Sequence, residues 1–157
     1  MLPLDRVHIS RTLRRTLRSG RFHCTADRAF AEVVEGCTEG RSDGTWITPS
    51  MVRAYRRLHE LGHAHSVEVW DADDRLVGGI YGVAIGGAFS GESMFHRVTD
   101  ASKVALVELA ARLRAHGFQL FDVQLPTRHL ESMGAVTMRR AAFLRALRSA
   151  AQLPVRF

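Results

Sequence analysis

The sequence contains little cysteine and no long run of apolar residues. Two cysteines, Cys24 and Cys37, cannot build a disulfide framework in a chain of 157 residues, so we expect a reducing environment and a cytoplasmic protein. No apolar run is long enough to cross a bilayer, and the N-terminus lacks the apolar stretch of a secretory signal. Membrane-embedded and disulfide-stabilised classes are therefore excluded, and we expect no membrane partner.

The sequence also lacks internal repeats, low-complexity tracts and linkers rich in proline, glycine or serine. Without such a linker, a chain of 157 residues is expected to form one domain, residues 1–157. Its core should bury roughly two thirds of the surface that the unfolded chain exposes. The composition, 46% hydrophobic and 24% charged, is that of an ordinary globular protein.

Lysine is nearly absent, and the positive charge comes from arginine. The chain has 22 Lys and Arg against 16 Asp and Glu, a formal net charge of +6, and Lys103 is its single lysine. Seven arginines lie between positions 6 and 28, where Asp5 and Asp27 are the neighbouring acids. This basic segment favours an anionic partner such as nucleic acid, although an arginine-rich composition can also be a habit of the source organism.

Hydrophobic periodicity predicts a mixture of helices and strands. Ser10 and the Thr48-Pro49 pair are suited to start helices, and Gly62 and Gly117 to end them. Alternating apolar and polar residues, interrupted by turns at 71–74 and 86–87, indicate a meander of antiparallel strands. The expected helices span 11–18, 25–36, 49–61, 101–116 and 139–150, and the expected strands span 66–70, 76–85, 88–95 and 118–124, with a polar loop at 38–44. This order is an α+β pattern in which the last strand joins the sheet.

Two motifs suggest chemistry that their context does not support. His59, Glu60 and His63 have the spacing of a zinc-protease motif, which requires both histidines on one helix and a third protein ligand. Because Gly62 ends the expected helix between the histidines, we expect no metal site. The stretch before Gly117 has part of the spacing of an acetyl-coenzyme A phosphate loop, but it lies at a helix end. We therefore expect no cofactor.

Three polar residues stand in otherwise apolar strands, where an unpaired polar side chain costs stability: Glu92, Asp122 and Gln124. Asp122 and Gln124 are two residues apart in the last expected strand, so we expect them on the same face of the sheet. A carboxylate beside an amide can orient a nucleophilic amine, or it can be a structural hydrogen bond. For Glu92, a salt bridge in the core and a ligand for an ammonium group both stay open.

Several longer stretches resemble one protein family in their content, order and spacing. They are Gly44–Thr48, Ala54–Trp70, Leu76–Gly82, Gly91–Phe95, Ala101–Lys103, Asp122–Gln124 and Ser132–Ala135. Together they are similar to the leucyl/phenylalanyl-tRNA–protein transferase family, and the resemblance runs from about Val7 to Leu147. The segment around His59 and His63 fits that family too, in which it carries no metal.

The resemblance implies an α+β, GNAT-like fold with a mixed, mostly antiparallel sheet flanked by helices. It also implies an activity: an apolar aminoacyl group moves from aminoacyl-tRNA to an amine and forms an amide bond. In the family the acceptor is the N-terminal Arg or Lys of a protein. A small-molecule amine in a biosynthetic pathway is a second possible acceptor for this chain.

The resemblance also implies roles for individual residues. Asp122 and Gln124 would orient and polarise the attacking α-amine, and Glu92 would hold the ammonium group of the donor. Trp46 and Tyr55 would pack near the terminal adenosine of the tRNA, although such aromatic residues are more often plain packing. The aminoacyl side-chain pocket would be lined by Ile80, Phe89, Met94, Leu109, Leu113 and Phe121. The tRNA phosphates would meet Arg11, Arg14, Arg15 and Arg18 of the basic segment.

The chain also departs from the family pattern, because family members begin with an additional N-terminal domain that helps to close the donor site. We expect the catalytic domain alone here, with a homodimer or a partner subunit as possible covers for the open side. The rival hypothesis is a non-catalytic tRNA- or RNA-binding remnant that keeps the fold and the basic segment. A zinc protease is a distant third hypothesis.

Overall fold

The described residues form a five-stranded sheet with helices on both faces. The computed structural model describes residues 1–39 and 46–157. The strands lie in the order β1 (His23–Ala26), β2 (Ala64–Trp70), β3 (Leu76–Ile85), β4 (Ala88–His96) and β5 (Leu120–Asp122). Neighbouring strands from β1 to β4 are antiparallel, and β5 joins β4 in parallel. The predicted α+β pattern with a mixed, mostly antiparallel sheet is thus confirmed.

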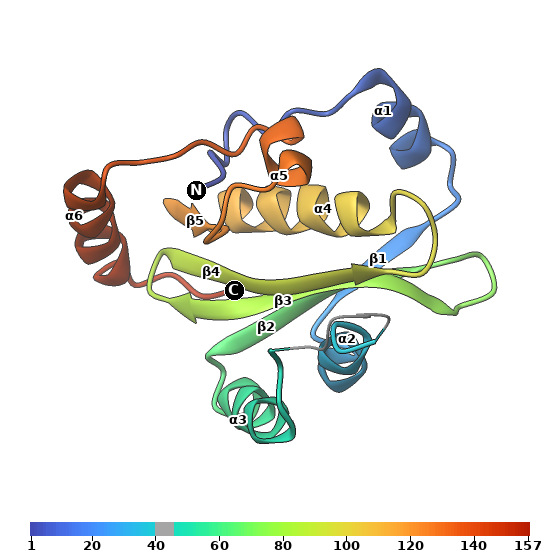
Figure 1. Ribbon diagram of the computed structural model, residues 1–157, viewed down its shortest axis with the longest axis horizontal. Coiled ribbons are helices and arrows are strands. Elements are labelled where there is room, and N and C mark those ends of the chain that lie inside the picture. The colour runs from blue at the N-terminus through green and yellow to red at the C-terminus, as the bar shows by residue number, and fades with distance from the viewer. Residues whose placement is uncertain (40–45) are drawn as a thin grey trace.

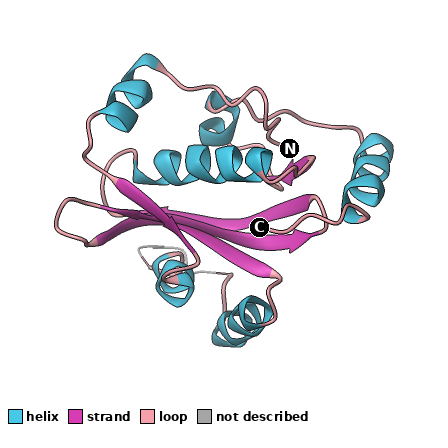
Figure 2. Cartoon of the chain, turned by 180° about the vertical axis from the view of Figure 1, so that it is seen from behind, coloured by secondary structure: helices cyan, strands magenta, loops and turns pink. Residues whose placement is uncertain are grey.

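The helices form two layers. The helices α1 (Arg11–Arg18), α4 (Ala101–Ala115) and α5 (Arg128–Ser132) lie on one side of the sheet (Figure 1). The helices α2 (Phe30–Gly36) and α3 (Pro49–Glu60) lie on the other side, and Figure 2 shows the same layers from behind. The last helix, α6 (Arg140–Ala151), packs beside β4 and β5 at one end of the sheet. Among the described residues, no helix is long and apolar enough to cross a membrane.

Local sequence signals explain several of these boundaries. The hydroxyl of Ser10 accepts a hydrogen bond from the N–H of Leu13 and caps α1. Thr48 caps α3 in the same way, with Pro49 in the first turn. The helix ends just before Gly62, whose φ of +76° favours glycine. These local signals made the predictions for α1 and α3 correct.

Each face of the sheet carries its own hydrophobic core. On the α4 side, Leu106, Leu109 and Leu113 are buried against residues of the strands, among them Phe89 and Phe121. On the other side, a second cluster joins α2 to β3 and includes Phe30, Val33 and Val34 with Ile47, Tyr81 and Phe95. A side chain buried in either core is therefore explained by packing, and its burial alone is no evidence of a functional role.

Two of the predicted elements have wrong boundaries. The helix expected over 25–36 begins only at Phe30, because residues 23–26 pair with β2 as the edge strand β1. The expected strand 118–124 is reduced to β5, and the short helix α5 follows where only a break was expected. The expected loop 38–44 lies mostly outside the described residues.

In β1, the Thr25 hydroxyl donates a hydrogen bond to the fully buried carboxylate of Glu68. The two residues are distant in sequence, so the local sequence carries no signal of this contact.

The strands β4 and β5 pair over only three residues, from Ala88 to Ser90 on β4. Just beyond, the register of β3 against β4 shifts, so that Gly82 faces Gly91, Tyr81 faces Ser93, and Glu92 is the extra residue of a β-bulge. Gly82 has no room for a side chain, since a Cβ there would lie 2.2 Å from the carbonyl oxygen of Ser90. The bulge therefore presents Glu92 where β5 no longer covers the edge of β4.

Candidate active site

A cavity of about 340 Å³ opens at this uncovered edge of β4. Its walls come from β3, β4, α4, α5 and the segment that follows β5, so residues distant in sequence meet there. They are Trp46, Ile80, Gly91, Glu92, Ser93, Met94, Leu106, Val123, Gln124, Leu125, Thr127 and Leu130. We call this cavity the donor pocket, after the role that the family resemblance implies for Glu92. Among these described residues, Glu92 is the one ionisable side chain in an otherwise largely apolar wall.

A tyrosine from the opposite layer fixes the position of Glu92. The Tyr55 hydroxyl on α3 donates a hydrogen bond of 2.9 Å to Glu92 Oε2. The Tyr55 ring packs edge-on against the buried ring of Tyr81, with their centroids 5.0 Å apart. Burial, and then the hydrogen bond and charge of Glu92, raise the pKa of Tyr55 above its usual value. Tyr55 therefore stays a neutral donor to the Glu92 side chain.

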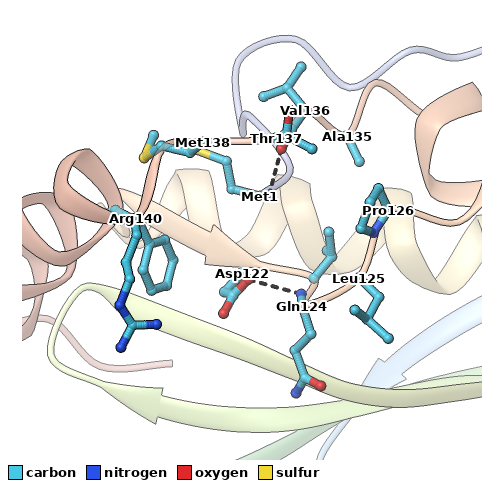
Figure 3. Close-up of a pocket in the computed structure, with 12 residues that line it drawn as sticks. Met1, Asp122, Gln124, Leu125, Pro126, Ala135, Val136, Thr137, Met138 and Arg140 are labelled. Carbon is cyan, nitrogen blue, oxygen red and sulfur yellow. Dashed lines mark hydrogen bonds between the residues drawn. The ribbon is translucent and has the colours of Figure 1, made fainter.

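The segment after β5 places Asp122 and Gln124 differently from the prediction. Asp122 ends β5, whereas Gln124 lies beyond the strand with a φ of +60°. The N–H of Gln124 donates to Asp122 Oδ1 over 2.9 Å (Figure 3). The expectation that both residues lie in one strand is therefore wrong, because β5 ends at Asp122. The two residues are nevertheless adjacent, joined through the backbone of a tight turn.

A second cavity, of about 280 Å³, lies on the far side of this turn (Figure 3). It is built largely from the segments after β5 and before α6. We call it the acceptor-side pocket, after the role that the family resemblance implies for Asp122 and Gln124. Its described lining is Met1, Asp122, Val123, Gln124, Leu125, Pro126, Ala135, Val136, Thr137, Met138, Arg140 and Phe143. Val123, Gln124 and Leu125 line both cavities, so the turn forms the wall between them.

The structure brings only part of the predicted aminoacyl-binding set into the donor pocket. Ile80 and Met94 line it. Four other members, Phe89, Leu109, Leu113 and Phe121, are at most 1% exposed in the core on the α4 side and do not line it. Their place in the wall is taken by Leu106, Val123 and Leu130. The apolar stripe of α4 is a sequence signal that includes Leu106, whereas Leu130 lies on α5, a helix that was not predicted.

The two aromatic residues expected near the adenosine, Trp46 and Tyr55, lie in different environments. Trp46 is 45% exposed and lines the donor pocket, which suits a residue that stacks on a ligand. Tyr55 contacts Glu92 and Tyr81 instead and is not among the residues lining the pocket.

The four arginines of the basic helix α1 are all exposed. Within the described residues, none of Arg11, Arg14, Arg15 and Arg18 forms an ion pair. The helix is attached to the start of α4 by a hydrogen bond of 3.3 Å from Thr16 Oγ1 to Asp100 Oδ2. A phosphate backbone could therefore approach these arginines without first breaking an ion pair.

The two histidines with the zinc-protease spacing do not lie on one helix, as predicted, because α3 ends between them. The helix ends at Glu60, and His63 lies beyond the turn at Leu61 and Gly62, directly before β2. His59 Nδ1 contacts the carbonyl oxygen of Ala64 at 2.8 Å, and its ring stacks on Phe30. In the described part of the chain, no three His, Cys, Asp or Glu side chains are grouped to hold a metal.

Two solved structures share this fold at low sequence identity. The structure of L-PGS from Bacillus licheniformis superposes with a TM-score of 0.55 and 11% identity, covering 94% of this chain and 50% of that chain. A ribosomal-protein-alanine N-acetyltransferase from Brucella melitensis biovar Abortus 2308 superposes with a TM-score of 0.53 and 16% identity, covering 75% of this chain and 94% of that chain. The GNAT-like fold that the sequence resemblance implied is therefore confirmed.

Sequence comparison is far more specific. The chain is 59% identical over 145 residues to a leucyl/phenylalanyl-tRNA–protein transferase of Stutzerimonas stutzeri (strain A1501), covering 91% of this chain and 64% of the relative. It is 56% identical over 142 residues to one of Salinibacter ruber (strain DSM 13855 / M31), covering 90% of this chain and 62% of the relative. The chain thus spans less than two thirds of the length of these two relatives.

The sequence model of the family described as leucyl/phenylalanyl-tRNA protein transferase matches residues 1–148. That match takes in the donor pocket, the turn between Asp122 and Gln124 and the basic helix. By its sequence over nearly its whole length, this chain belongs to the leucyl/phenylalanyl-tRNA–protein transferase family.

Proposed function

We propose that this chain, as a single domain, transfers an apolar aminoacyl group such as leucyl or phenylalanyl from aminoacyl-tRNA to an amine. The observation that carries the proposal is the position of Gln124, which lines both the donor pocket and the acceptor-side pocket. A reaction that joins two substrates needs them to meet at one wall. Asp122, bonded to the same turn, adds a carboxylate on the acceptor side.

In the donor pocket, Glu92 holds the α-ammonium group of the aminoacyl ester. Tyr55 bonds Oε2 of Glu92 and keeps the carboxylate in place for this contact. The apolar side chain of the amino acid packs against Ile80, Met94 and Leu106. A mainly apolar wall distinguishes similar side chains by only about 1–3 kcal/mol per methylene, so this lining favours a class of amino acid.

Trp46 stacks on the terminal adenosine at the rim of the same pocket, and the exposed arginines of α1 contact phosphates farther along the tRNA. No cofactor takes part in this scheme. The ester that joins the amino acid to tRNA is already activated, so positioning supplies most of the rate.

In the transfer step, the nitrogen of the acceptor amine attacks the ester carbonyl carbon. The new C–N bond forms, the C–O bond to the ribose breaks, and one amine proton ends on the released ribose hydroxyl. Gln124 and Asp122 orient the amine by accepting its hydrogen bonds from the acceptor side. The acceptor is a protein N-terminus with a basic first residue, or a small-molecule amine.

The test is transfer of a radiolabelled amino acid from a panel of charged tRNAs that includes leucyl-tRNA and phenylalanyl-tRNA. Acceptors are an Arg-initiated peptide and small amines. Transfer by the wild-type chain that is lost in Asp122→Asn, and retained in the exposed-surface control Asp73→Asn, supports the proposal. The absence of transfer with every donor and acceptor contradicts it.

A second candidate function is tRNA binding without turnover. The exposed arginines of α1, which form no ion pair within the described residues, favour it. This candidate predicts salt-sensitive tRNA binding that is unchanged by Asp122→Asn, with no transfer to any acceptor. The same preparations used in the transfer assay decide between the two functions.

A further inference from the structure

A third cavity, of about 450 Å³, adjoins the donor pocket and has no role in the scheme above. Met94 lines both cavities, so they are neighbours along the edge of β4. The new cavity lies between the end of β4, the start of α4 and the short helix α5. Its lining is Met94, His96, Thr99, Asp100, Ser102, Lys103 and His129.

This cavity gathers nitrogen donors. Lys103, the single lysine of the chain, donates a hydrogen bond of 2.9 Å to Asp100 Oδ1. An ammonium group has three N–H donors, so it can also donate to a ligand. His129 Nε2 is enclosed and makes no hydrogen bond within the described structure. Because an enclosed nitrogen without a partner is costly, a shift of the ring that brings Nε2 to a ligand is favoured.

The one acidic side chain in the described lining of the cavity, Asp100, is already paired with a positive charge. Asp100 accepts hydrogen bonds from Lys103 and from Thr16, and Lys103 is the main cause that holds the pKa of Asp100 below its usual value. The pKa of His129 is lowered by burial, and further by the charges of Lys103 and His96. Burial and the nearby ammonium group of Lys103 therefore oppose protonation of His129, and a bound anion would offset the effect of that ammonium group.

The location of the cavity indicates which anion it would hold. On one side it shares Met94 with the donor pocket. On the other side, Asp100 bonds Thr16 of the basic helix α1. The cavity therefore lies between the donor pocket and α1, where a single strand that contacts both regions can cross it.

We propose that Lys103, His129 and His96 bind a phosphodiester of the single-stranded 3′ end of the donor nucleic acid. The proposal rests on the proposed function, because it assumes that the terminal nucleoside occupies the donor pocket. It adds a binding site between the two regions that were already expected to contact tRNA.

The experiment compares two donors that carry the same amino acid. One is an aminoacyl-adenosine without a phosphate, and the other is an aminoacyl-CCA trinucleotide. For Lys103→Met and His129→Leu, we expect kcat/KM with the trinucleotide to fall about tenfold and kcat/KM with the nucleoside to stay unchanged. Lys103→Arg, which keeps the charge, should restore most of the loss. Arg148→Met, an exposed arginine on α6, is the matched control.

Binding of a fluorescent, unacylated CCA trinucleotide is measured in parallel against salt. Lys103→Met should reduce the slope of log affinity against log salt concentration by about 0.7, the value for one phosphate contact of a single strand. Inorganic phosphate should compete with the trinucleotide in the wild-type chain and compete less in Lys103→Met.

Equal losses with the two donors, or no loss with either, would overturn the phosphodiester site. Competition by inorganic phosphate that is identical in the wild type and in Lys103→Met would also overturn it. If the wild-type chain transfers nothing from either donor, the proposed function fails. The trinucleotide binding data then still decide whether the cavity holds a phosphate.

Discussion

The two pockets on either side of Gln124 are built in different ways. The donor pocket is walled mainly by regular elements, and its carboxylate is fixed by a tyrosine from the opposite layer of the fold. The acceptor-side pocket is walled mainly by the segments 123–126 and 135–138, with the start of α6. A wall of regular elements holds its side chains with less freedom than a wall of connecting segments. We therefore expect the donor side to be selective and the acceptor side to tolerate more than one amine.

The largest effect is expected at the wall between the pockets. Asp122→Asn removes the charge that orients the amine while it keeps the size of the side chain. We expect kcat to fall by about 10²–10⁴, because both pockets depend on this turn, with little change in the KM for the donor. Steady-state kinetics with each substrate varied in turn measure this. A rise in the donor KM without a fall in kcat would instead place Asp122 in donor binding.

The next effect separates the donor pocket from the core beneath it. Leu109 is 1% exposed in the core on the α4 side, one helical turn from the pocket-lining Leu106. Leu109→Ala should lower the free energy of unfolding by about 2–5 kcal/mol through the cavity that it leaves. Urea denaturation measures the loss. The preference of the folded protein among aminoacyl-tRNA donors should not change. A changed preference would show that Leu109 contacts the aminoacyl group after all.

This contrast between Leu106 and Leu109 also shows how far the sequence could be interpreted. The helices α1, α3 and α4 and the meander of β2 to β4 were predictable, because caps, turns and hydrophobic period are local signals. The strand β1 was missed because four residues become a strand only by pairing with β2, far along the chain. Which leucine of one apolar stripe meets a pocket depends on the elements packed against it.

The position of Gln124 was beyond local prediction for a related reason. A period of two residues placed it on a strand, but the strand ends at Asp122 and the chain turns with a positive φ at a residue other than glycine. Asp122, Gln124 and Glu92 were selected as polar residues in apolar surroundings, and that reasoning needs no knowledge of the turn. The bond from Tyr55 to Glu92, which joins two layers, left no trace in the local sequence.

On the donor side, Glu92→Gln should remove the charge that holds the α-ammonium group. A hydrogen bond to a charged group is worth about 1.5–3 kcal/mol, so we expect kcat/KM for the donor to fall about 10- to 100-fold. A donor with an α-hydroxyl in place of the α-amine should show almost no dependence on the substitution. Glu60→Gln, on the exposed end of α3, serves as the control. If both donors lose equally, Glu92 has a structural role.

A smaller effect on the same side is expected from Tyr55→Phe. The ring keeps its packing against Tyr81, and only the hydroxyl bonded to Glu92 is lost. Because one neutral donor contributes about 0.5–1.5 kcal/mol, kcat/KM for the donor should fall about 2- to 10-fold. The loss should disappear in the background of Glu92→Gln, which a double-mutant cycle measures. If the losses of the two substitutions are additive, Tyr55 and Glu92 act independently, which would contradict this prediction.

The smallest effect concerns the acceptor-side pocket, where the exposed Arg140 stands in the same lining as Asp122. Its positive charge should repel a basic acceptor and attract an acceptor that carries a carboxylate. Arg140→Met should therefore lower the KM for an Arg-initiated peptide and raise the KM for a small amine with a carboxylate, each by about 2- to 5-fold. Both changes should shrink as salt is added, since the group is exposed to solvent. Opposite shifts for the two acceptors, with no change in the KM for the donor, would show that the acceptor side discriminates by charge alone. Parallel shifts would contradict the division of the site into two independent pockets.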